Sequence, residues 1–174
     1  MILVTGGSAS GKSAFAEKLL TERSSEGRTY LATMNPAGKE AAERIARHRK
    51  MREGAGFTTV ECPVHISDAA SLCGRAVLLE DLGNLVANEM FCEALPKKSE
   101  IVTEKIISGV EQLNCKLKHL VIVTNNVFED GVLYDELTME YIRAMGLINR
   151  RLAAKADKVI EVVVGIPVIV KEGK

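Results

Sequence analysis

The chain has 174 residues, a length that suits one compact domain with a sizeable core. Its content of 47% hydrophobic and 26% charged residues is typical of a globular protein and excludes a disordered or membrane-embedded chain. The 23 Lys and Arg residues balance the 23 Asp and Glu residues, so the net charge does not indicate a nucleic-acid or membrane partner. The N-terminus lacks the basic region of a signal peptide, and no apolar run could span a bilayer, so we expect a cytoplasmic protein.

The predicted elements alternate between strands and helices along the chain. Mostly continuous apolar runs predict the strands, and helical periodicity predicts the helices between them. The expected strands are 1–5, 28–32, 76–80, 120–124 and 159–164, and the expected helices are 13–23, 39–51, 85–95, 101–113 and 137–154. The final VVVGIPVIVK predicts two strands broken at 165–167, an edge hairpin, and LPKKSE (95–100) predicts a loop. This alternation predicts an α/β fold over 1–174, with a mostly parallel sheet flanked by helices.

The four cysteines are scattered along the sequence and form no C-x-x-C pair: Cys62, Cys73, Cys92 and Cys115. Such spacing is not typical of a metal site or of a disulfide framework. We therefore expect core thiols in a protein of a reducing compartment.

The most informative motif follows the first predicted strand. Residues 6–13, GGSASGKS, match the pattern G-x-x-x-x-G-K-[ST]. Its glycines let the backbone curl so that successive N–H groups point at phosphate oxygens, and the next helix adds its positive N-terminal end. Lys12 can bridge the outer phosphates, and the Ser13 hydroxyl can ligate magnesium. Because the motif lies between a predicted strand and a predicted helix, it predicts a nucleoside triphosphate site rather than a chance glycine-rich turn.

A P-loop also needs an acidic residue at the end of another strand to hold magnesium. The stretch AVLLED (76–81) supplies Glu80 and Asp81 after four apolar residues. We favour Glu80 as the magnesium ligand, although an error of one residue in the strand would exchange the two. The alternative is a pair of solvated carboxylates that end a strand.

A basic segment, ERIARHRKMR (43–52), contains five Arg or Lys residues around His48. It could be a solvated helix face, or His48 could pack on the flank of a helix. At helical spacing, however, His48 shares a face with Ile45, and Arg44 and Arg52 lie one turn on either side. Their positive charge disfavours the imidazolium, so we expect a neutral, nucleophilic imidazole. This combination suits a covalent phosphoramidate intermediate, with the arginines binding a triphosphate.

Motifs spread over nearly the whole chain resemble the bifunctional adenosylcobinamide kinase/adenosylcobinamide-phosphate guanylyltransferase family of cobalamin biosynthesis. The matching stretches are ILVTGGSASGKS (2–13), YLAT (30–33), ERIARHR (43–49), TVECP (59–63), LLED (78–81), VTNNV (123–127) and GLINRRLAAKADKVIEVVVGIP (146–167). The histidine of RIARHR and the pattern of Asn149, Leu152, Ala153 and Asp157 are far more specific than the P-loop. The resemblance implies a RecA-like P-loop fold and a homotrimer.

The resemblance also implies two activities. One phosphorylates the aminopropanol hydroxyl of adenosylcobinamide with ATP or GTP, and the other transfers GMP from GTP onto that phosphate through a guanylylated histidine, which maps onto His48. Magnesium, GTP, ATP and a corrinoid acceptor are the implied ligands, with Ser13 and Glu80 at the metal. The implied nucleotide contacts are Gly6, Gly7, Ser8, Ala9, Ser10, Gly11, Lys12, Ser13, Ala32, Thr33, Met34, Arg44, Arg49, Lys50, Met51, Arg52, Glu61 and Glu80.

Three stretches differ from the pattern of that family. Ala9 replaces the usual arginine of G-G-x-R-S-G-K-S, and residues 53–57 lack the proline and tryptophan of R-P-x-x-W. Where the family usually has T-N-E-V-G, Asn126 and Phe128 replace the glutamate and the glycine. A missing carboxylate affects a step that needs a general base more than one driven by a covalent histidine, so these differences concern the kinase activity most.

P-loop proteins of other functions are alternatives. A guanylyltransferase that has lost its kinase activity is one alternative, and a small-molecule kinase that uses its arginines as a phosphate clamp is another. A regulatory GTPase would carry N-K-x-D, which the chain lacks. A nucleic-acid ATPase is disfavoured by the neutral charge and the 4% aromatic content.

Overall fold

In the computed structural model, residues 1–25, 27–35, 54–93, 95–126, 131–132 and 134–173 are described. Their strands form one seven-stranded sheet in the order β3-β2-β4-β5-β1-β6-β7. The strands are β1 (Ile2–Thr5), β2 (Arg28–Ala32), β3 (Phe57–Glu61), β4 (Ala76–Glu80), β5 (His119–Val123), β6 (Lys158–Val163) and β7 (Ile166–Glu172). Neighbouring strands pair in parallel, except for the antiparallel pair β6–β7.

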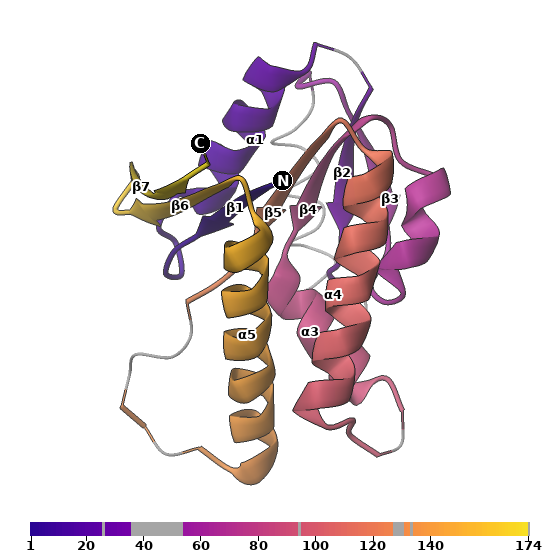
Figure 1. The fold of residues 1–174 in the computed structure, drawn as a ribbon, viewed down its shortest axis with the longest axis vertical. Helices are drawn as coiled ribbons and strands as arrows, with labels where there is room; N and C mark the ends of the chain where they lie inside the picture. The colour runs from indigo at the N-terminus through magenta and orange to yellow at the C-terminus, as the bar shows by residue number, and fades with distance from the viewer. Residues whose placement is uncertain (26, 36–53, 94, 127–130, 133, 174) are drawn as a thin grey trace.

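Helices cover both faces of this sheet (Figure 1). They are α1 (Lys12–Arg23), α3 (Leu82–Phe91), α4 (Ser99–Lys116) and α5 (Glu136–Lys155), with a short 3-10 helix η1 (Ile66–Ser71). Successive strand residues point to opposite faces, so Leu3 packs in the core layer with α3, α4 and α5, whereas Val4 packs with α1. Both faces are therefore buried, which explains the continuous apolar runs of the central strands.

The five predicted strands are confirmed, each to within one residue. Strand β3 was not predicted, because FTTVE has no continuous apolar run and exposes Thr58 and Glu61 at the edge of the sheet. The helix predicted at 85–95 instead spans Leu82–Phe91, since the Asp81 carboxylate caps it by accepting a hydrogen bond from Asn84 N at 2.7 Å. The predicted loop 95–100 is shorter, because α4 begins at Ser99. The helix predicted at 39–51 lies outside the described residues.

The predicted C-terminal edge hairpin is also confirmed. Its turn is at Val164 and Gly165, and Pro167 lies within β7 rather than in the break. A proline is tolerated there because β7 is an edge strand. Among the helices of the described ranges, none is long and apolar enough to cross a membrane.

The expectation that all four cysteines are core thiols is wrong for two of them. Cys62 is buried and Cys73 half-buried, whereas Cys92 and Cys115 are exposed, the first just after α3 and the second near the end of α4. Burial raises the pKa of the Cys62 thiol to about 11. All four are free thiols.

Candidate nucleotide-binding site

The P-loop curls between the end of β1 and the start of α1. Gly6 and Gly11 have φ values of 156° and 90°, in the region that favours glycine. A Cβ atom on Gly6 would lie 2.6 Å from the Val162 carbonyl oxygen of β6, so this glycine permits the close approach of the two segments. Gly165 N donates to Ser10 O at 2.9 Å and joins the loop to the C-terminal hairpin.

Lys12 is the first residue of α1 and is only 8% exposed. Its Nζ donates to Gly7 O within the same loop, at 3.0 Å. A lysine ammonium carries three N–H donors, so this one contact leaves Lys12 able to bind phosphate oxygens at the mouth of the loop.

Ser13 and Glu80 meet beside the loop. The Ser13 hydroxyl donates to Glu80 Oε1 at 2.5 Å. Glu80 Oε2 is buried and has no hydrogen-bond partner among the described residues. Burial raises the pKa of Glu80 to about 7, the Ser13 hydrogen bond opposes this shift, and the nearby Asp81 adds to it. The positive charge of Lys12 also opposes the shift, but it is the smallest of these effects, so burial dominates the pKa of Glu80.

These two side chains have the chemistry of magnesium ligands. Both offer hard oxygen atoms, and the unpartnered Oε2 is the atom that a cation would satisfy. Within the described part of the chain, no group of three or more His, Cys, Asp or Glu residues could hold a metal. A magnesium ion here would take its other ligands from phosphates and water, as this ion commonly does.

Asp81, the other candidate acid, is engaged differently. Its Oδ1 accepts from Asn84 N at 2.7 Å and its Oδ2 accepts from Asn125 Nδ2 at 3.3 Å. The carboxylate of Asp81 thus caps α3 and holds the end of β5, while Glu80 contacts the P-loop serine.

A second hydrogen-bond chain joins α5 to the P-loop. The buried Thr124 hydroxyl donates to Asn149 Oδ1 at 2.7 Å, and Asn149 Nδ2 donates to Asn125 O at 3.2 Å. Asn126 N then donates to Gly6 O at 3.3 Å. No motif assigns a role to Asn149, whose only signal in the sequence is its place in the C-terminal pattern. The structure shows that Asn149 holds the strand end that adjoins the P-loop.

The carboxyl end of β2 lies beside Glu80. Thr33 is buried, and its N and Oγ1 donate to Glu80 O and Asp81 O at 3.0 and 2.6 Å. Ala32 is paired in register with Glu80 on one side and with Glu61 on the other. Met34 is half-buried just beyond. The structure thus brings the P-loop, Glu80 and the end of β2 to one edge, with the exposed Glu61 one strand further out.

The remaining predicted residues lie outside the described ranges. They are His48, Arg44, Arg49, Lys50, Met51 and Arg52. Their predicted roles stay predictions.

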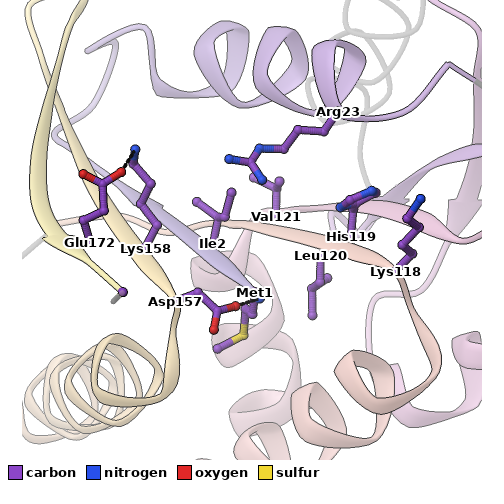
Figure 2. Close-up of a pocket in the computed structure, with 11 residues that line it drawn as sticks. Met1, Ile2, Arg23, Lys118, His119, Leu120, Val121, Asp157, Lys158 and Glu172 are labelled. Carbon is purple, nitrogen blue, oxygen red and sulfur yellow. Dashed lines mark hydrogen bonds and ion pairs between the residues drawn. The ribbon is translucent and has the colours of Figure 1, made fainter.

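A cavity of about 350 Å³ lies at the amino ends of the strands, at the opposite end of β1 from the P-loop (Figure 2). There Asp157 forms an ion pair with the Met1 amino group, and Lys158 pairs with Glu172 at 2.8 Å. Because Met1 precedes β1 and the P-loop follows it, this cavity is separate from the candidate nucleotide site. Asp157 of the C-terminal pattern therefore has a structural contact here.

A P-loop between a strand and a helix, with an acidic residue at the end of a second parallel strand, defines a P-loop nucleotide-binding protein. The expected α/β P-loop fold is confirmed by the mostly parallel sheet, its flanking helices and the edge hairpin. The sequence model of a family described as cobinamide kinase/cobinamide phosphate guanyltransferase matches residues 2–170, and the chain belongs to that family.

Curated relatives agree with this assignment over nearly their whole length. The bifunctional adenosylcobalamin biosynthesis protein CobU of Salmonella typhimurium is 36% identical, over 98% of this chain and 99% of that protein. The protein of the same name from Escherichia coli is 32% identical, over 98% and 99%. CobP of Pseudomonas aeruginosa is 29% identical, over 97% and 96%. Among solved structures, the flagellar accessory protein FlaH of Methanocaldococcus jannaschii is similar with a TM-score of 0.46 and 14% identity, over 99% of this chain and 78% of that one.

Proposed function

We propose that this protein is a bifunctional transferase of cobalamin biosynthesis. It phosphorylates adenosylcobinamide with ATP or GTP, and it transfers GMP from GTP to adenosylcobinamide phosphate, giving adenosylcobinamide-GDP. The observation that carries the proposal is the contact between Ser13 and Glu80 beside the P-loop lysine, in a chain that matches a cobinamide kinase/guanyltransferase family over residues 2–170.

In the kinase step, the backbone N–H groups of the loop 6–13 bind the nucleotide phosphates. Lys12 exchanges its contact with Gly7 O for the outer phosphate oxygens. Ser13 and Glu80 would hold magnesium, which when bound neutralises charge on the phosphates. Glu80 does so as the carboxylate, and a cation beside it lowers its pKa from about 7.

In the guanylyl step, the His48 imidazole attacks the α-phosphorus of GTP. An N–P bond forms, the bond between the α-phosphorus and its bridging oxygen breaks, and pyrophosphate leaves. The phosphate of the corrinoid then attacks the same phosphorus and releases His48. Arg44 and Arg52 offset charge on the pyrophosphate together with Lys12. This step rests on the sequence resemblance, because residues 36–53 lie outside the described ranges.

The proposed contacts with the guanine nucleotide are Ala32, Thr33, Met34 and Glu61, with Arg49, Lys50 and Met51 of the basic segment. Glu61 supports this set, because it lies in register with Ala32 on the side away from Glu80. We also propose a homotrimer, a cytoplasmic location and a single domain over 1–174.

One observation favours a second candidate, a guanylyltransferase that has lost the kinase step. Asn126 occupies the place of the usual glutamate, and its backbone N donates to Gly6 O. The carboxylate that could accept the proton of the acceptor hydroxyl is therefore missing from that position.

Trapping of the covalent intermediate tests the proposal. The protein is incubated with α-labelled GTP and magnesium, without corrinoid, and then examined for bound label. We expect label that is labile in acid and stable in base, as a phosphoramidate is. A His48→Ala variant should lose this label entirely while it still binds GTP. Label that persists in the variant would show that a residue other than His48 carries the GMP, and no label on the unaltered protein would favour a kinase without histidine chemistry.

A further inference from the structure

Helix α3 leads away from the proposed nucleotide site. It begins directly after Glu80 and Asp81 and extends beside α5 on one side of the sheet (Figure 1). At a rise of about 1.5 Å per residue, its last residue, Phe91, lies roughly 15 Å along the helix from Asp81. The helix therefore links the reaction centre to a more distant surface.

The open face of α3 changes from polar to apolar along its length. Asn84, Asn88 and Phe91 are spaced i, i+4 and i+7, which places them on one side of the helix. Near the nucleotide end, Asn88 Nδ2 donates to Thr33 O and Pro63 O at 2.8 and 3.0 Å. At the far end, Phe91 is 44% exposed.

Two hollows meet on this face, at Ala87 and Phe91. One, of about 540 Å³, is also lined by Pro63, Val64 and Asn88. The other, of about 380 Å³, is also lined by Leu137 and Tyr141 of α5. We call this surface, formed by Pro63, Val64, Ala87, Phe91, Leu137 and Tyr141, the α3 groove.

The wall that α5 contributes to the α3 groove is held in place. Asp135 Oδ1 accepts from the backbone N–H groups of Leu137 and Thr138, both at 3.0 Å, which fixes the first turn of α5. The Tyr141 hydroxyl donates to Gly83 O at 3.4 Å and ties α5 to α3. Leu137, 50% exposed, is thus presented beside Phe91 on a preformed surface.

We propose that the α3 groove binds the corrin macrocycle of the acceptor, an inference that rests on the proposed function. The acceptor reacts through a small polar arm, while the bulk of the molecule is a broad macrocycle whose ring and methyl groups are apolar and whose rim carries amides. A surface that is polar beside Glu80 and apolar about 15 Å away fits that shape. In parallel α/β sheets, ligands bind beyond the carboxyl ends of the strands, which is where α3 starts.

Equilibrium binding of cobinamide, followed by its visible absorption, tests this inference. The Phe91→Ala and Leu137→Ala variants are compared with Leu72→Ala, a matched change of a side chain that is 69% exposed outside the α3 groove. We expect each groove variant to raise the Kd for cobinamide about tenfold, while the Kd for GTP stays within twofold. Leu72→Ala should change neither value, and Phe91→Leu should restore most of the cobinamide affinity.

The outcomes separate the inference from the proposed function. Failure of the unaltered protein to bind cobinamide would contradict both. Normal binding by the unaltered protein, with cobinamide affinity unchanged in both groove variants, would overturn the α3 groove alone. A change of sedimentation coefficient without a change of cobinamide affinity would show that the surface is a subunit contact. Parallel loss of GTP and cobinamide binding, without rescue by Phe91→Leu, would also overturn it.

Discussion

The Ser13 hydroxyl donates to the Glu80 carboxylate at 2.5 Å, across 67 positions of sequence. The contact exists because β4 brings Glu80 to the same edge of the sheet as the P-loop. It distinguishes the two adjacent acids, since Asp81 is bonded to Asn84 and Asn125 instead. The site thus holds a buried carboxylate whose charge is suited to a cation.

The raised pKa of Glu80 makes stability depend on pH. Burial lifts this pKa from 4.5 to about 7, so between these values the unfolded chain loses the proton while the folded protein keeps it. Stability therefore falls as pH rises through this window, by about 2–3 kcal/mol for this group. Without nucleotide or metal, Glu80→Gln should match the unaltered protein at pH 4.5 and be more stable by about that amount at pH 8. Chemical denaturation at the two pH values measures the difference.

Asp81→Asn is the matched control. It should raise the magnesium concentration needed for activity less than Glu80→Gln does. The reverse ranking in a magnesium titration would identify Asp81 as the ligand.

Lys12→Ala should weaken the binding of both ATP and GTP about 100-fold or more, because it removes a charged donor from the phosphates. Lys18 lies on the same helix with its side chain 76% exposed, so Lys18→Ala is the control and should bind as the unaltered protein does. Calorimetric titration gives both affinities. Equal affinities in the two variants would refute the assignment of the loop.

Gly6→Ala should destabilise the protein by about 2 kcal/mol or more, since its Cβ would lie 2.6 Å from both Val162 O and Ser10 Oγ. A Cβ on Gly7 meets no atom within 4 Å, so Gly7→Ala should leave thermal stability nearly unchanged. Thermal unfolding of the two variants without nucleotide makes the comparison. Similar melting temperatures would contradict the tight approach of the loop to β6.

Thr124 and Asn149 should be energetically coupled. Asn149→Leu leaves the buried Thr124 hydroxyl without its acceptor, at a cost of about 1–3 kcal/mol. Adding Thr124→Val removes that hydroxyl, so the double variant should lose less stability than the sum of the single variants, by about 1 kcal/mol. Urea unfolding of the four proteins measures the coupling, and additive losses would mean that the hydrogen bond contributes little.

The sequence predicted the central sheet and the P-loop because both have local signals. Apolar runs define the buried strands, and the spacing from Gly6 to Ser13 defines the loop. Strand β3 has no such signal, because none of its residues is fully buried and both Thr58 and Glu61 are exposed at the edge of the sheet. The start of α3 was misplaced because Asp81 was considered as a metal ligand or a solvated carboxylate, and not as the cap of a helix.

Other features of the site depend on contacts between distant segments. The sequence left Glu80 and Asp81 as alternatives, and only the tertiary arrangement shows which of them contacts Ser13. Asn149 is 25 residues from Thr124, so no local pattern could pair them. The α3 groove likewise combines α3, α5 and the residues after β3, which no single stretch of sequence reveals.

The central claim is that one protein carries out both transfers on the same acceptor. The most direct measurement supplies adenosylcobinamide, magnesium and GTP labelled distinguishably at its α- and γ-phosphates, and then isolates the corrinoid product. We predict one γ-derived and one α-derived phosphorus in each molecule of product, no product with Lys12→Ala, and γ-labelled adenosylcobinamide phosphate alone with His48→Ala. A product labelled only from the γ-phosphate by the unaltered protein, or α-label that still reaches the product with His48→Ala, would contradict the account.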